Sequence, residues 1–129
     1  MGYFYSKTLE GSFQEAENKV SNALLDVGFG ILTEINIKDA FSEKLGIEHK
    51  NYKILGACNP NLAHEAINYE INIGILMPCN IVLIDNEDGT TEIVFPKAQS
   101  PLDVTDNNHI INLSKQVDSI LKEAFNNIN

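Results

Sequence analysis

The sequence predicts an α+β fold in which a mostly antiparallel sheet carries two long helices packed on one face. Two segments, one near each end of the chain, have apolar residues at helical spacing. Between them lie several short runs with the character of strands, and two of these runs flank the hairpin signal Asp88-Gly89. The chain has 129 residues, which suits a single domain over residues 1–129 that buries its core without a disulfide or a metal.

The first two predicted elements are a strand and a long helix. Residues 3–9, "YFYSKTL", alternate as a strand does. The helix begins at Ser12, because Glu15 three residues later completes a capping box in which each side chain accepts a backbone N–H of the other. Gly28 ends the helix, since glycine adopts the left-handed conformation without a Cβ clash. The predicted buried face consists of Phe13, Ala16, Val20, Ala23, Leu24 and Val27.

A second strand, a short helix and a third strand are predicted next. Residues 29–35 have the pattern of a strand, and Asn36 then caps a short helix that ends at Gly46. Residues 52–58, "YKILGAC", are largely apolar, which predicts a strand that is central or covered on both faces. The buried side of the short helix is expected to consist of Ile37, Ala40, Phe41 and Leu45.

The second half of the chain contains a hairpin and the last helix. Residues 72–78 fit no single pattern, whereas residues 79–85 and 91–96 predict the two strands of the hairpin. Residues 97–108 are rich in turn-forming types and predict a loop. Residues 109–128 predict the last helix. Its inward-facing residues are expected to be Ile110, Leu113, Val117, Ile120, Leu121, Ala124 and Phe125.

The composition argues against several classes of partner. The net charge is -9, and all nine basic residues are lysines. Because nucleic-acid binding needs a basic surface, and arginine is the usual reader of phosphates and guanine, we expect no nucleic-acid partner. The longest apolar stretch, residues 73–84, is too short to span a bilayer, so we expect no membrane partner. Two cysteines, with no signal-peptide pattern at the start, predict a reducing cytoplasmic location.

Two Cys-Asn pairs stand out as a candidate site, and the first of them is Cys58-Asn59. Cys58 lies where a predicted strand ends and a helix begins, with Asn59 as the N-cap and Pro60 as the first helical residue. The partial positive charge at a helix start lowers a thiol pKa and favours the reactive thiolate. The alternative interpretation is a buried cysteine that acts as a small apolar residue, which is the commoner case.

The second pair is Cys79-Asn80, which follows Pro78. Cys79 opens a strand and is expected to face the core, while Asn80 suggests a bulge. His64 lies on the helix that follows Cys58. These two thiols and His64 would bind zinc only if the fold brought them together, so we expect no metal and no cofactor. The candidate ligand-binding residues are Cys58, Asn59, His64, Cys79 and Asn80.

Three blocks in this order, "GFGILTEI", "LGACNP" and "PCN", resemble the DUF302 family of small bacterial and archaeal proteins. The resemblance extends from Phe13 to about Phe95. It implies a TBP-like (TT1751-like) α+β fold and a homodimer, and it implies no established activity, cofactor or catalytic residue. Within the motifs, the matching residues are Cys58, Asn59, Pro60, Pro78, Cys79 and Asn80.

Three functions remain open from the sequence. The first is a small homodimeric protein that binds a small ligand, or has an accessory role, at the two Cys-Asn segments. The second is a thiol-based redox or sulfur-handling protein in which Cys58 reacts and Cys79 resolves the product. The third is a structural module that acts through protein contacts. The chain has no nucleophile motif of hydrolases and no phosphate-binding loop, and whether it is an enzyme stays open.

Overall fold

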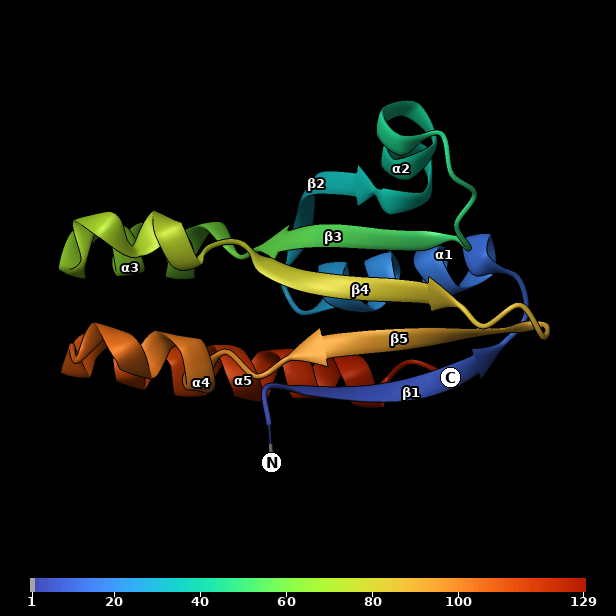
Figure 1. The fold of residues 1–129 in the computed structure, drawn as a ribbon. Coiled ribbons are helices and arrows are strands. Elements are labelled where there is room, and N and C mark those ends of the chain that lie inside the picture. The colour runs from blue at the N-terminus through green and yellow to red at the C-terminus, as the bar shows by residue number, and fades with distance from the viewer. Residues whose placement is uncertain (1) are drawn as a thin grey trace.

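The computed structural model describes residues 2–129, and these contain a five-stranded sheet (Figure 1). The strand order is β1-β5-β4-β3-β2, and every neighbouring pair is antiparallel. β4 therefore lies at the centre, while β1 and β2 form the two edges. The strands are β1 Phe4–Glu10, β2 Gly30–Asn36, β3 Tyr52–Cys58, β4 Cys79–Asp85 and β5 Thr90–Pro96.

Two long helices, α1 and α5, cover one face of the sheet and lie behind it in Figure 1. α3 and α4 instead extend past one end of the sheet. The antiparallel sheet with both long helices on one face confirms the predicted α+β fold class. The helices are α1 Phe13–Asp26, α2 Ile37–Leu45, α3 Pro60–Tyr69, α4 Gln99–Leu102 and α5 Asn108–Asn126, with 3-10 helices η1 Ile71–Leu76 and η2 Asp103–Thr105.

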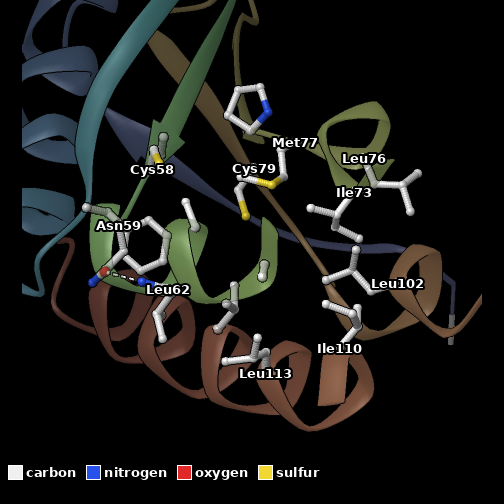
Figure 2. A pocket seen from close by; sticks show the side chains of 16 residues that line it. Cys58, Asn59, Leu62, Ile73, Leu76, Met77, Cys79, Leu102, Ile110 and Leu113 are labelled. Carbon is white, nitrogen blue, oxygen red and sulfur yellow. Dashed lines mark hydrogen bonds between the residues drawn. The ribbon is translucent and has the colours of Figure 1, made fainter. Parts of the chain in front are cut away.

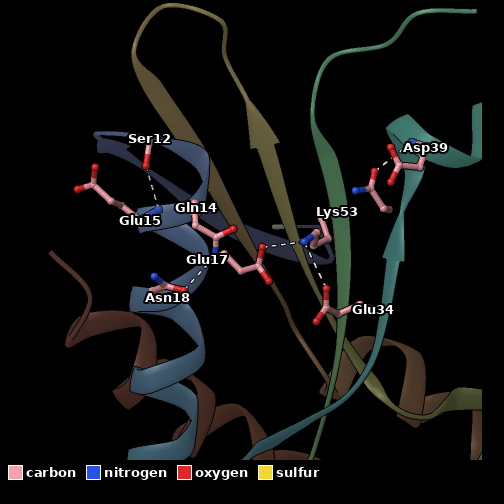
Figure 3. Close-up of polar contacts among 9 residues, drawn as sticks. Ser12, Gln14, Glu15, Glu17, Asn18, Glu34, Asp39 and Lys53 are labelled. Atoms are coloured by element: carbon pink, nitrogen blue, oxygen red, sulfur yellow. Dashed lines mark hydrogen bonds and ion pairs between the residues drawn. The ribbon is translucent and has the colours of Figure 1, made fainter. Parts of the chain in front are cut away.

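One capping contact at each helix confirms the predicted starts of α1 and α2 (Figure 3). Ser12 Oγ accepts a hydrogen bond from the backbone N–H of Glu15 at 3.1 Å. Asn36 Oδ1 does the same for the N–H of Asp39, also at 3.1 Å. Gly28 follows α1 with φ +89°, a conformation that disfavours any side chain. These caps satisfy N–H groups that have no acceptor within the helix, so nearby residues specify where each helix starts.

The hydrophobic core is divided into two clusters. The larger cluster lies between the sheet and the two long helices, and Phe95 at its centre is fully buried. The smaller cluster consists of Ile73, Ile110 and Leu113, where α5 runs past the sheet beside α3 and η1. Leu62 on α3 packs against both clusters. The part of the molecule beyond the sheet therefore has a small core of its own.

Lysine side chains hold the last residues of the chain against the first elements. Lys7 on β1 donates hydrogen bonds to the main-chain oxygens of Phe125 at 2.7 Å and Ile128 at 2.9 Å. Lys19 on α1 donates to the main-chain oxygen of Asn129 at 2.9 Å. Cations near the C-terminal end of a helix stabilise its free carbonyl groups, so these lysines fix the end of α5.

A third lysine joins α1 to the sheet (Figure 3). Lys53 on β3 forms ion pairs with Glu17 of α1 at 2.8 Å and with Glu34 of β2 at 3.3 Å. Burial by itself lowers the pKa of Lys53, but its hydrogen bonds to the two carboxylates outweigh burial and raise the pKa. The charged form of Lys53 is therefore favoured, and its two ion pairs link α1, β2 and β3.

The opposite face of the sheet carries a row of aliphatic side chains. Ile35, Ile54, Val82 and Val94 are paired in register across four neighbouring strands, β2, β3, β4 and β5. Alternate residues of a strand point to opposite faces, so this row lies on the side that α1 and α5 do not cover. All four side chains keep some contact with solvent.

The predicted loop over residues 97–108 was wrong, because α4 and η2 occupy much of it. The carboxylate of Asp118, on α5, accepts hydrogen bonds from the backbone N–H groups of Ala98 and Gln99. It thus supplies the acceptor that the local sequence lacks at this helix start. The contact joins residues about twenty positions apart, and a local sequence pattern does not reveal it.

The expected burial of Leu45 was also wrong, since its side chain is 63% exposed. α2 lies beside one end of β3 at the margin of the sheet, and none of its residues is fully buried (Figure 1). A helix without a second layer over it buries only the side chains that touch the strand, so the last turn projects into solvent.

The bulge expected at Asn80 was wrong as well. The register between β3 and β4 is continuous through Asn80 to Cys79. The irregularity lies instead in the edge strand β2, where the pairing shifts between Ile31 and Thr33. An edge strand has one partner only, so it accommodates an extra residue more easily than the central strand does.

Gly56 on β3 is predicted to be required where this strand packs closely against Thr33 and Pro78. A Cβ at this position would lie 2.7 Å from Cγ of Pro78 and closer still to the side chain of Thr33. Gly56→Ala is therefore expected to lower the free energy of unfolding by about 1–3 kcal/mol, as measured by urea denaturation. Gly30→Ala is the matched control, because a Cβ there meets no described atom within 4 Å. Equal losses in the two variants would contradict this explanation.

Candidate functional site

A cavity of about 70 Å³ lies between the two hydrophobic clusters, at the end of the sheet (Figure 2). Sixteen residues line it, and they come from β3, α3, η1, β4, α4 and α5, with Phe29 before β2, Asn59 before α3, and Met77 and Pro78 before β4. Phe29 and Ala57 belong to the larger cluster, whereas Ile73, Ile110 and Leu113 form the smaller one. The cavity therefore occupies the junction at which the two cores fail to merge.

This cavity brings the two Cys-Asn segments together. Cys58 ends β3 and Cys79 begins β4, and the antiparallel pairing of Ala57 with Cys79 places these two strand ends side by side. Both thiols line the cavity, and both cysteines are free (Figure 2). Segments about twenty residues apart in the sequence thus form adjoining parts of one wall.

Asn59 shapes the cavity through the helix that it caps. Its Oδ1 accepts a hydrogen bond from the backbone N–H of Leu62 at 3.1 Å, and Pro60 occupies the first helical position. The predicted start of α3 is thereby confirmed. The cap sets the direction of α3, and this direction brings Leu62, Ala63 and Ala66 to the cavity.

The other two candidate residues lie outside the cavity. Asn80 is exposed, on the sheet face opposite to Cys79, because neighbouring residues of a strand point to opposite faces. His64 is exposed on α3, although Ala63 beside it lines the cavity. Of the five candidates, the structure brings together Cys58, Asn59 and Cys79.

Burial raises the pKa of both thiols. For Cys58, removal from water is the cause. For Cys79, burial comes first, followed by the negative charges of Asp118 and of the Cys58 thiolate, and the pKa rises to about 11. Both thiols are therefore protonated at neutral pH. This direction is opposite to the lowering that a reactive Cys58 at the helix start would need, and it favours the alternative interpretation of a buried cysteine.

The candidate zinc ligands are not assembled into a site. Over residues 2–129, no group of three or more His, Cys, Asp and Glu side chains converges as a metal ion would require. His64 is exposed on α3, away from the cavity that the two thiols share.

Among the helices that the structure describes, none has the length and apolar character needed to cross a bilayer.

Sequence reasoning missed the far wall of the cavity, which is formed by η1, α4 and the first part of α5. Ile110 and Leu113 were predicted to face inward, but nothing in the sequence showed that they face a cavity. Ile73 lies in the apolar run that fitted no pattern, and Leu102 lies in a predicted loop. An apolar run without a strand or helix period was the one available signal for this wall.

The lining suits the binding of an uncharged apolar group. No lysine, histidine, aspartate or glutamate lines the cavity, and its polar groups are Asn59 and the two protonated thiols. Cavities with apolar walls tend to stay dry and to accept small apolar molecules. Acid–base chemistry needs a titratable group poised near neutral pH, and the thiols are shifted away from it.

Comparison with known proteins agrees with the fold. No curated protein matches the sequence. The crystal structure of an uncharacterized conserved DUF302 protein from Bacillus stearothermophilus aligns over 100% of both chains, with a TM-score of 0.90 and 22% sequence identity, and this likeness shows a shared fold. The sequence profile described as "Domain of unknown function DUF302" matches residues 5–128. The chain therefore belongs to the DUF302 family.

Proposed function

We propose that this protein binds a small, predominantly apolar ligand in the cavity at the two Cys-Asn segments. The observation that carries the proposal is that Cys58, Asn59 and Cys79, from two segments distant in sequence, line one apolar cavity. Ligand sites are typically concave and mostly apolar, with a few polar groups that orient the ligand. Asn59 and the two thiols would be those groups, since a protonated thiol is a weak hydrogen-bond donor.

The packing of the rest of the protein supports this proposal. Protein interiors are close-packed, and an empty cavity of this size is costly because its walls lose contacts. In this protein the cavity lies at the junction of the two clusters, where six elements meet. A ligand that fills it would restore the missing contacts and join the two cores.

A substitution that fills the cavity is expected to abolish ligand binding. Ala63→Leu places a larger apolar side chain at the cavity wall. In a thermal-shift screen of small metabolites, a ligand at 100 times its Kd should stabilise the wild type by about 2.7 kcal/mol and leave Ala63→Leu unchanged. His64→Ala is the matched control, because this neighbouring residue is exposed and does not line the cavity.

Two outcomes would contradict ligand binding in the cavity. One is that no compound stabilises the wild-type protein. The other is that a compound stabilises Ala63→Leu as strongly as the wild type, because the ligand would then bind elsewhere.

A thiol-based redox role is the second candidate, and the proximity of the two free cysteines favours it. The raised pKa of both thiols acts against it, since the thiolate is the reactive form. We propose that the thiols orient a ligand and remain reduced, as they would in the cytoplasm.

Slow thiol alkylation is the expected result. Iodoacetamide at pH 7.5 should modify both cysteines more slowly than a free cysteine derivative, and Cys79 more slowly than Cys58. The rate at Cys79 should rise with pH toward its pKa of about 11, because only the thiolate reacts. Mass spectrometry of the native protein measures both rates. Fast alkylation at neutral pH, or a Cys58–Cys79 disulfide under mild peroxide, would instead support the redox role.

We also propose that the protein forms a homodimer through the aliphatic row Ile35, Ile54, Val82 and Val94. This row crosses four of the five strands on the face that the long helices leave open. In a two-fold dimer the same patch on each copy packs against itself, so a continuous apolar row is self-complementary. A monomer would leave the row in water.

A charge in the row should dissociate the dimer. Val82→Lys places a cation at its centre, and burying two such cations without partners is strongly unfavourable. Light scattering at micromolar concentration should show a wild-type dimer and a monomeric variant. Asn22→Lys is the control, since Asn22 is exposed on α1, which covers the opposite face of the sheet. A monomeric wild type would refute the dimer and leave the open face to a different protein partner.

A further inference from the structure

We infer that the ligand is a single-chain aliphatic amphiphile whose head group is uncharged or cationic, and that it extends from the cavity into an adjoining hollow. This inference rests on the proposed function, because the chain would occupy the same cavity. It adds the chemical class of the ligand, its direction and the position of its head group.

The adjoining hollow lies where η1 and η2 meet. Its volume is about 250 Å³, and its lining includes Glu70, Ile75 and Val104. Ile73 and Leu76 line both the cavity and the hollow, so the two spaces adjoin at these side chains. A ligand that occupies both spaces would have to pass these two side chains.

The sizes of the two spaces point to an elongated ligand. The cavity of about 70 Å³ is far smaller than ordinary ligand pockets, which begin at about 300 Å³. With the hollow of about 250 Å³, the combined space reaches that lower limit. A ligand that uses both spaces must be narrow where it passes Ile73 and Leu76, and an unbranched alkyl chain has that shape.

The mouth of the hollow is unusually apolar for a surface. Ile75 is 85% exposed and Val104 is 75% exposed, and both line the hollow. Exposed large apolar side chains next to a groove are typical of a binding surface, because a ligand that covers them removes apolar area from water. An alkyl chain leaving the cavity would cover both side chains.

The charges at the hollow determine the head group. Glu70 lines the hollow, and Asp103 and Asp106 flank its Val104–Thr105 edge in the sequence. No lysine or histidine lines either space. A carboxylate head group would therefore meet like charges without a cation to pair with. A hydroxyl could bond to the polar side chains there, and an ammonium group could pair with Glu70.

The wall between the two spaces belongs to the least supported part of the core. η1 has six residues, and it rests on the smaller cluster, which has three buried side chains. Segments with few buried contacts open locally at a lower free-energy cost than the main core does. An entering chain can thus displace Ile73 or Leu76 without disturbing the sheet.

The test is a series of unbranched alcohols from butanol to octanol, measured by isothermal titration calorimetry. For the wild type, affinity should increase about fourfold with each added methylene, as expected for apolar burial. Octylamine should bind at least as tightly as octanol, and octanoate should bind at least about tenfold more weakly.

A single substitution at the mouth separates the hollow from the cavity. Val104→Glu places a charge beside the alkyl chain at an exposed position, so the fold is retained. It should weaken octanol binding about tenfold or more and leave butanol binding unchanged. Leu25→Glu is the matched control, because Leu25 is 66% exposed on α1 and lines neither space.

The possible results distinguish this inference from the proposed function. If butanol binds and Ala63→Leu blocks it, but affinity does not grow with chain length or Val104→Glu has no effect, the extended ligand is refuted and the cavity site stands. If octanoate binds as tightly as octanol, the assignment of the head group is refuted. If no alcohol binds and the metabolite screen also finds nothing, both proposals fall.

Discussion

The last helix is longer than the sheet it covers, and much of the structure depends on this mismatch. α5 has 19 residues, which corresponds to about 28 Å. A strand of seven residues spans about 23 Å. The half of α5 that carries Leu121 and Phe125 packs on the sheet, whereas the half that carries Ile110 and Leu113 needs another partner. α3, η1 and α4 supply it.

The cavity follows from the way in which these two halves are covered. A sheet and a set of short helices present surfaces of different shape to the same helix, and close packing on one does not continue onto the other. The strand ends that carry Cys58 and Cys79 lie at this junction, so the two Cys-Asn segments line the cavity by virtue of their place in the sheet. The proposed binding role therefore rests on this geometry and does not require reactive thiols.

Local signals in the sequence were sufficient for the helix starts and for the core face of the strands. Ser12, Asn36 and Asn59 each cap a helix through a contact three residues away, which a sequence pattern contains in full. The alternation in β4 likewise predicted that Cys79 faces the core. The distant contact of Asp118 with Ala98, the register shift in β2 and the cavity depend on three-dimensional packing. Asn80 and His64 were candidates by proximity in sequence, and the periods of strand and helix point both of them away.

The lysine contacts of β1 and α1 also have a consequence for the order in which the protein folds. β1 is made first, but its strand partner β5 appears some eighty residues later, and the oxygens that Lys7 binds belong to residues 125 and 128. Until that part of the chain has been synthesised, β1 lacks both its strand partner and the hydrogen bonds of Lys7. Contacts between such distant residues slow folding, because the intervening chain must first be closed into a loop. β1 therefore stays an unpaired strand while about eighty further residues are synthesised.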